Sequence, residues 1–386
     1  MPTRFEFASA TRILFGAGVL AEVAPAVKSM GRRAFIVTGR NPDRAQPLLA
    51  QLKSSGIEAD VFPTSGEPTI ALVQAGVEAL RAAGCDVVVA IGGGSVVDAG
   101  KAIAALATNR AEPLEYLEVI GRGRPLEQPP LPFVAIPTTA GTGAEVTRNA
   151  VLSSPEHRVK VSLRSPMMLP RLAVVDPELS LGLPAALTAS TGMDALTQLI
   201  EPFLSCRANP MTDAFCRQGI PLVARSLRRA CKAPGDLAAR EDMALASLLS
   251  GLALANSGLG AVHGFAAAIG GMFPAPHGGV CAALLPHAMR ANWRALCEHE
   301  SSHRELTRFD EVAAMLTCEA QATAEEGLEW LKALSVDLAI PRLSAYGVSS
   351  SDATVVCEKA AASSSMKGNP IPLTGGELAE IFAAAL

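Results

Sequence analysis

Short runs of β-branched and apolar residues alternate with amphipathic stretches through the first half of the chain. Buried strands are predicted over residues 34–38, 59–62 and 86–91, and further strands over residues 133–136 and 172–175. Between them, residues 43–54 and 69–83 repeat apolar positions at the spacing of a helix. Strands and helices that alternate in this way predict βαβ units and a parallel sheet.

The pattern changes after Pro184. From there the chain is rich in alanine and leucine, with helical periodicity and few β-branched runs. Helices are predicted over residues 185–206, 211–231, 237–255 and 282–299. The segment 176–184 contains two prolines and a glycine, which are typical of a boundary. We therefore predict an α/β domain with a Rossmann-like parallel sheet over residues 1–183 and an all-helical domain over residues 184–386.

Length, charge and cysteine content narrow the class of protein. A chain of 386 residues exceeds the size at which one hydrophobic core stops growing, which agrees with two domains. The net charge is −4 and no basic run occurs, so nucleic acid is not an expected partner. Charges at Arg4, Glu6 and Arg12 argue against a secretory signal, and no stretch is long and apolar enough to suggest a membrane span. Eight scattered cysteines without a CxxC pair favour reduced thiols and a cytoplasmic location.

A glycine-rich turn follows the predicted strand 86–91. The residues Gly92, Gly93, Gly94 and Ser95 lead into a helical pattern. Glycines let a ligand approach the backbone, and the unpaired N–H groups at a helix start attract a pyrophosphate. The sequence does not fit GxGxxG, so the Rossmann fingerprint is absent and a simple tight turn stays an alternative.

A second polar loop strengthens the cofactor hypothesis. Residues 136–147, with the sequence IPTTAGTGAEVT, place four threonines and two glycines directly after a predicted strand. Small hydroxyl groups on a flexible backbone can hydrogen-bond a phosphate, a ribose or a nicotinamide amide. A loop with only a connecting role would not need this density of hydroxyl groups.

Candidate metal ligands lie in the helical half. Asp194 and Gln198 are four residues apart on a predicted helix, so both project from one face. His263 and His277 are the best further candidates. A carboxylate with two imidazoles suits iron(II), zinc or manganese, although a structural role for either histidine stays open.

Taken together, these motifs resemble the iron-containing alcohol dehydrogenase family. The chain carries, in the order of the family, GGGSxxDxxK, IPTTAGTGxE, GMDALT, GLGAVH, and PHG followed by LLPH. The resemblance covers nearly the whole chain. It implies a dinucleotide-binding α/β domain, a helical metal-binding domain with the active site in the cleft between them, and hydride transfer between an alcohol or aldehyde and NAD or NADP.

The resemblance also assigns site residues. It implies that Asp194, His263 and His277 are catalytic metal ligands for one divalent ion, Fe²⁺ or Zn²⁺, with Gln198 at the fourth ligand position. The positions that match cofactor-binding residues of the family are Gly39, Gly93, Gly94, Ser95, Asp98, Thr138, Thr139, Thr142, Thr147, Lys160 and Leu179.

Three positions depart from the family pattern. The fourth ligand is usually histidine, and the neutral amide of Gln198 is a weaker donor. Ala267 stands where a second histidine usually lies beside the nicotinamide, so a different proton route is expected. Gly39 and Arg40 follow the first predicted strand in place of an aspartate that accepts the ribose hydroxyls, which favours NADP over NAD.

The sequence predicts a metal-dependent NAD(P)-linked alcohol dehydrogenase or aldehyde reductase. A metal-independent reductase resembling maleylacetate reductase is one alternative, and a non-catalytic dinucleotide-binding protein is another. Lyase chemistry like that of dehydroquinate synthase is disfavoured because no strongly basic phosphate site lies near Asp194.

The N-terminal segment bears on assembly. Apolar and polar residues alternate over residues 4–15, a pattern that predicts a strand able to extend the sheet or pair with a second subunit. The family resemblance favours a homodimer.

Overall fold

The computed structural model describes residues 4–298 and 303–386, which form two compact units. The α/β unit comprises Ala8–Thr139 and Gly143–Ser180. The helical unit comprises the described residues of Leu181–Leu386, the segment Ala140–Thr142 and residues 4–7. The main division thus falls between Ser180 and Leu181, three residues before the predicted boundary, and part of the second polar loop groups with the helical unit.

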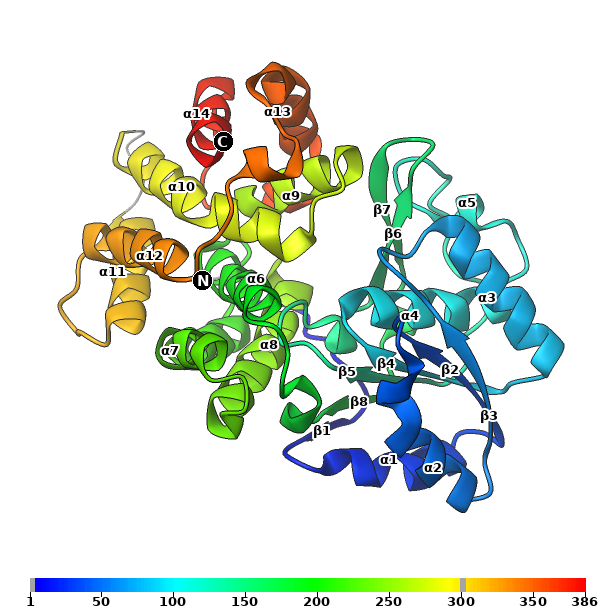
Figure 1. Cartoon of the computed structure of the whole chain (residues 1–386). Helices are drawn as coiled ribbons and strands as arrows, with labels where there is room; N and C mark the ends of the chain where they lie inside the picture. The colour runs from blue at the N-terminus through cyan, green and yellow to red at the C-terminus, as the bar shows by residue number, and fades with distance from the viewer. Residues whose placement is uncertain (1–3, 299–302) are drawn as a thin grey trace. The chain divides into compact units, whose positions relative to one another are not determined.

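A six-stranded parallel sheet forms the centre of the α/β unit (Figure 1). The strand order is β1-β8-β5-β4-β2-β3. The strands are β1 (Ile13–Phe15), β2 (Arg33–Thr38), β3 (Glu58–Pro63), β4 (Val87–Gly92), β5 (Phe133–Pro137) and β8 (Leu172–Val175). Each of the five predicted strands is present. The prediction that residues 59–62 are buried is wrong, because β3 lies at the edge of the sheet and its residues are exposed or partly exposed.

Helices cover both faces of this sheet. They are α1 (Val23–Lys28), α2 (Gln46–Ser54), α3 (Ile70–Ala83) and α4 (Gly94–Thr108), with a short α5 (Pro113–Tyr116). Val88 and Ala90 of β4 pack with residues of α3 and α4, whereas Val87 and Val89 pack with residues of α1 and α2. Successive side chains of a strand point to opposite faces, so a strand covered on both sides must be apolar at every position.

A two-stranded hairpin was not predicted. It consists of β6 (Asn149–Ser154) and β7 (Val159–Arg164), which pair antiparallel. Buried and partly exposed positions alternate along β6, and Val161 and Leu163 are the buried positions of β7. In β7 the sequence VKVSLR alternates apolar and polar residues, which is the signal of a half-buried strand, whereas β6 (NAVLSS) shows no such alternation.

The predicted strand over residues 4–15 is mostly wrong. Only Ile13–Phe15 forms a strand, which pairs in parallel with β8 at one edge of the sheet. β1 pairs over three residues, and β8 itself contains four. Before it, the ring of Phe7 contacts that of Phe215, with ring centroids 5.6 Å apart.

The helical unit contains nine helices within its described residues. They are α6 (Ala185–Leu204), α7 (Pro210–Lys232), α8 (Leu237–Ser257), α9 (Ala261–Met272), α10 (His277–Glu298), α11 (His303–Thr317), α12 (Ala324–Asp337), α13 (Ala353–Ala362) and α14 (Gly375–Ala385). The four predicted helices correspond to α6, α7, α8 and α10. The predicted end at residue 299 lies outside the described residues, and α10 begins earlier than predicted, at His277. Among the helices described, none alone combines the length and apolar composition of a membrane span, and only α8 with α9, bent by 97°, would pass as a pair.

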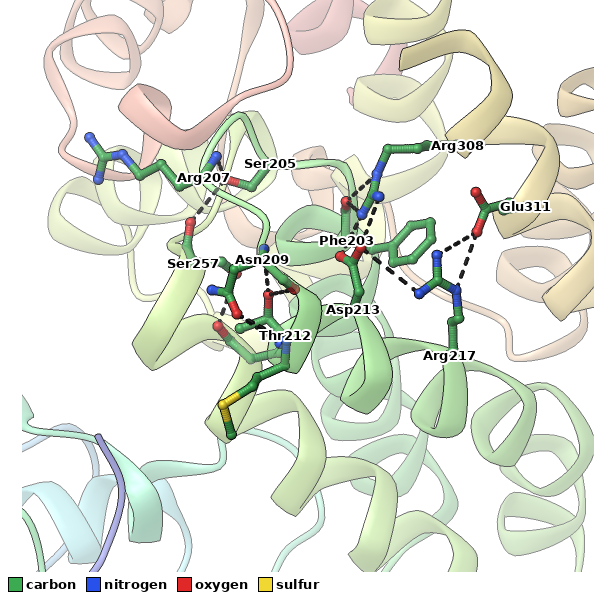
Figure 2. Close-up of polar contacts among 12 residues, drawn as sticks. Phe203, Ser205, Arg207, Asn209, Thr212, Asp213, Arg217, Ser257, Arg308 and Glu311 are labelled. Atoms are coloured by element: carbon green, nitrogen blue, oxygen red, sulfur yellow. Dashed lines mark hydrogen bonds and ion pairs between the residues drawn. The ribbon is translucent and has the colours of Figure 1, made fainter. Parts of the chain in front are cut away.

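A buried ion pair joins α11 to the start of α7 (Figure 2). Arg308 donates to both carboxylate oxygens of Asp213, over 3.0 Å from Nη1 and 2.6 Å from Nη2. Its guanidinium also donates to the carbonyl oxygen of Phe203 and lies 3.9 Å from the centroid of the Phe203 ring. Asp213 is fully buried, so this bidentate contact is protected from water.

Candidate metal centre and cofactor loops

Three helices bring four possible metal ligands together. Asp194 comes from α6, His263 from α9, and His277 and Cys281 from the first turns of α10. One donor atom of each lies within 4.8 Å of the others. Gly278 permits this approach, because a Cβ at that position would lie 2.6 Å from the carbonyl oxygen of Ser190 on α6.

The carboxylate of Asp194 is the clearest sign of a ligand at this site. Its Oδ1 atom is buried and has no hydrogen-bond partner among the described residues. The Nε2 atoms of His263 and His277 lie 3.4 and 3.7 Å from it, too far for short hydrogen bonds. A buried carboxylate oxygen without a partner is costly. A divalent metal ion would satisfy it, and this set of donors fits such an ion.

The electrostatics of the site favour a charged cluster. The pKa of Asp194 lies below its usual value: burial raises it, but the nearby imidazoles of His277 and His263 lower it by more. The pKa of His263 lies well above its usual value, because attraction to Cys281 and Glu201 outweighs the effect of burial. The pKa of His277 is also raised, against burial, by Cys281 and Asp194.

Glu201 is a positioning residue that the sequence analysis missed. Its Oε2 lies 2.6 Å from Nδ1 of His263, and its Oε1 accepts the backbone N–H of Val262 over 2.7 Å. This contact places a proton on Nδ1 and leaves Nε2 to face Asp194. A signal existed, because Glu201 lies seven residues after Asp194 and so on the same face of α6.

Replacing Glu201 by glutamine should weaken metal binding by about 10- to 100-fold, the usual cost of losing the outer partner of a ligating histidine. The amide keeps a hydrogen bond but no longer holds the imidazole by charge. Competition with a chromophoric chelator measures the dissociation constant, with the variant Glu311→Gln on exposed α11 as the control. Equal affinity in the wild type and in Glu201→Gln would show that this contact does not support the site.

Gln198 and Ala267 are the two positions of the helical unit that depart from the family pattern. Gln198 is buried one turn after Asp194, and its Oε1 lies 3.1 Å from the hydroxyl of Ser250 on α8. Ala267 is partly buried one turn after His263 on α9. The role of Gln198 as a fourth ligand stays a prediction.

Four of the predicted cofactor residues lie just beyond the carboxyl ends of the parallel strands. Gly39 follows β2, Gly93 follows β4, Thr138 follows β5 and Leu179 lies just beyond β8. These strands are parallel and in register, with Thr38 opposite Ile91 and Gly92 opposite Pro137. Open α/β folds bind their ligands at the carboxyl ends of the parallel strands.

The glycine turn over residues 92–95 brings the end of β4 and the start of α4 close together. A Cβ on Gly92 would lie 2.6 Å from the side chain of Val96, so only glycine fits between β4 and α4. Gly93 is the N-cap of α4, and Gly94 and Ser95 open the helix, partly exposed. The N–H groups of a first helical turn have no intrahelical partners and can receive an anion. A Cβ on Gly93 would lie 3.5 Å from the Oγ1 atom of Thr139, so the Thr139 hydroxyl lies close to this turn.

Lys101 ties the second polar loop to α4 and was not singled out from the sequence. Its buried Nζ donates to the carbonyl oxygens of Ala144 and Asn149, each over 2.8 Å, and to the hydroxyl of Thr147 over 2.9 Å. Burial lowers the pKa of Lys101 to about 8, despite the opposing charges of Asp98 and Glu145. The hydroxyl of Thr147 is therefore oriented by Lys101.

The other predicted cofactor residues have contacts of their own. Asp98 accepts the backbone N–H of Val151 over 3.1 Å, which holds β6 against α4. The ammonium of Lys160 lies 3.2 Å from a carboxylate oxygen of Glu67. Thr142 lies in the segment Ala140–Thr142, which groups with the helical unit.

Comparison with known proteins places these two units in one family. The family model of the iron-containing alcohol dehydrogenases matches residues 10–177. The model of the C-terminal domain of Fe-containing alcohol dehydrogenases matches residues 188–386. This chain belongs to the iron-containing alcohol dehydrogenase family. It is accordingly an oxidoreductase, as the sequence predicted.

The sequence of this dehydrogenase is similar to those of individual relatives over nearly their full length. It is 38% identical over 362 residues to 1,3-propanediol dehydrogenase of Klebsiella pneumoniae, covering 92% of each chain. It is 33% identical to the NAD-dependent methanol dehydrogenase of Bacillus methanolicus, covering 97% of each. A crystal structure of a 1,3-propanediol oxidoreductase superposes with a TM-score of 0.91 at 36% identity, over 99% of this chain and 100% of that one.

Proposed function

We propose that this dehydrogenase interconverts small alcohols and their aldehydes, with one divalent metal ion and a nicotinamide cofactor. The observation that carries the proposal is the buried Oδ1 of Asp194, which lacks a hydrogen-bond partner among the described residues and faces two imidazole nitrogens. The names of the relatives, which include a propanediol and a methanol dehydrogenase, support small alcohols as substrates.

Each group of residues has a part in this reaction. Asp194, His263 and His277 would hold the ion. When bound, such an ion supplies a Lewis acid for a carbonyl or alkoxide oxygen. The start of α4 would bind the pyrophosphate, and the threonines of the second polar loop would orient the rest of the cofactor for hydride transfer at nicotinamide C4.

The proton needs a route without an imidazole at residue 267. Alanine can neither hold nor move a proton, so we propose that the proton passes through the cofactor ribose hydroxyls and solvent. The space left by the missing ring would also admit a substrate bulkier than ethanol.

An assay of purified protein tests the function. We expect reduction of NAD⁺ or NADP⁺ with propanol or 1,3-propanediol, loss of this activity after chelation, and its recovery with Zn²⁺ or Fe²⁺. Full activity after chelation would instead favour a metal-independent reductase. Cofactor binding without turnover of any alcohol or aldehyde would favour a non-catalytic dinucleotide-binding protein.

NADP is the proposed cofactor of choice, with NAD also accepted. Arg40 is exposed just beyond β2, where a cation can pair with a 2′-phosphate and no carboxylate repels it. The variant Gly39→Asp should shift the ratio of kcat/KM for the two cofactors toward NAD by about tenfold or more, because a ribose-binding carboxylate repels the 2′-phosphate. A Cβ at Gly39 would lie 3.9 Å from Val96, so the change fits without strain. If Gly39→Asp left the ratio of kcat/KM for NADP and NAD unchanged, the proposed preference for NADP would lose its support.

We also propose a cytoplasmic homodimer. All eight cysteines are free thiols, which suits a reducing compartment. β1 is an edge strand of the sheet, and an edge strand can pair with a second copy of the chain. A monomeric mass in light scattering at micromolar concentration would contradict the dimer.

A further inference from the structure

Cys281 lies where a fourth metal ligand would be. It is fully buried one turn after His277 on α10, so both side chains project from the same face of this helix. Its Sγ atom is 3.7 Å from Nε2 of His277 and 3.9 Å from Nε2 of His263. A hydrogen bond between a thiol and an imidazole is weak, so these contacts alone do not explain why a sulfur atom points at the cluster.

The distances match a tetrahedral site. With bonds of 2.0–2.1 Å to nitrogen or oxygen and 2.3 Å to sulfur, a tetrahedral zinc ion separates its ligand atoms by about 3.3 to 3.6 Å. The structure has 3.4 Å between His263 and Asp194, 3.7 Å between His277 and Asp194, and 3.7 and 3.9 Å from sulfur to the imidazoles. A contraction of a few tenths of an ångström around an ion would bring these four distances into range, and the other two pairs of donor atoms lie within 4.8 Å.

Gln198 is the competing donor, and it is less suited. The Oε1 atom of Gln198 lies within hydrogen-bond distance of the Ser250 hydroxyl. An amide oxygen is also neutral and hard, whereas a thiolate is charged and forms strong bonds to zinc. Asp194, with its oxygen unpartnered among the described residues, and the two histidines face Cys281 instead.

We propose that Cys281 is the fourth metal ligand of this enzyme, bound as a thiolate, and that it makes the site prefer Zn²⁺ to Fe²⁺. The proposal rests on the metal site of the proposed function and deepens it by naming a ligand and a metal. The ligand set becomes one carboxylate, two imidazoles and one thiolate. Thiolate ligation favours zinc over iron(II) more than an amide oxygen would, because the softer donor adds to the general preference for zinc.

Cobalt substitution tests the ligand directly. We expect the wild-type protein loaded with Co²⁺ to show a near-ultraviolet thiolate-to-cobalt charge-transfer band. Cys281→Ser should remove the band, whereas Gln198→Ala should keep it. Cys297→Ser changes an exposed cysteine on the same helix and is the matched control that should also keep the band. A band that survives Cys281→Ser, or a wild type that binds cobalt without one, would overturn the proposal.

A measurement on the unmodified protein covers the case in which Cys281→Ser does not fold. X-ray absorption of the zinc-loaded wild type should show one sulfur neighbour at about 2.3 Å among nitrogen and oxygen neighbours. A first shell of nitrogen and oxygen alone would overturn the proposal.

Metal competition tests the selectivity. With Zn²⁺ and Fe²⁺ offered together under anaerobic conditions, the wild type should bind mostly zinc, and Cys281→Ser should lower its zinc-to-iron ratio by roughly tenfold or more. An equal ratio in both would refute the claim about selectivity. These readouts do not depend on turnover. A sulfur-ligated ion in a protein inactive on all alcohols would contradict the proposed function but not the ligand, whereas an active enzyme with no sulfur at its ion would contradict the ligand alone.

Discussion

Replacing His277 by alanine should abolish metal binding and lower kcat/KM for alcohols by at least about a thousandfold. A Lewis-acid ion contributes several kcal/mol of transition-state stabilisation, and each 1.4 kcal/mol corresponds to about a factor of ten. His277 is the best ligand to remove, because its side chain is 32% exposed, whereas that of Asp194 is 2% exposed and its loss would leave a hole in the core. Metal analysis after gel filtration and steady-state kinetics give the two readouts.

The control is His287→Ala. It removes a partly buried histidine from the same helix, α10, outside the cluster of four donors. It should keep its metal and its activity. If His277→Ala bound metal as tightly as the wild type, or turned over fully after chelation, the metal role of this cluster would be wrong.

Replacing Asp213 by alanine should lower the free energy of unfolding of the helical unit by about 3 to 5 kcal/mol. The change leaves the buried guanidinium of Arg308 without its counter-charge, so the cost of keeping that charge out of water is no longer offset. Denaturant titration followed by circular dichroism measures the effect. The pair needs no metal or cofactor, so it can be measured on the protein without ligands.

The exposed ion pair of Arg217 and Glu311, which lies beside the buried pair of Asp213 and Arg308, provides the comparison (Figure 2). Arg217 donates to Glu311 over 2.8 Å, and both side chains are more than a third exposed. Glu311→Ala should therefore cost no more than about 1 kcal/mol. The double variant Asp213→Ala with Arg308→Met should be more stable than Asp213→Ala alone, because it buries no unpaired charge. Equal losses from Asp213→Ala and Glu311→Ala would show that burial does not strengthen the first pair.

Local patterns in the sequence located most of the strands and the two candidate cofactor loops. A parallel strand covered on both faces must be apolar at every position, so β2, β4 and β5 were recognisable as runs. The glycine turn after β4 was equally visible, because the tight passage from strand to helix leaves no room for a Cβ on Gly92. The hairpin of β6 and β7 was missed although apolar and polar residues alternate along β7, and of the strand expected over residues 4–15 only Ile13–Phe15 formed.

Which side chains meet at the candidate metal centre was decided by the tertiary structure. The sequence determined that Asp194, His263 and His277 were candidates, since their residue types and motifs resemble those of a known family. It gave no reason to choose Cys281 from eight scattered cysteines or to pair Glu201 with His263. Helical periodicity fixes which residues share a face of one helix, but it does not say which faces of α6, α9 and α10 turn toward one another. That choice depends on how three helices pack around a common core, where Gly278 lets α10 approach α6 and the sulfur of Cys281 comes to lie beside two imidazoles.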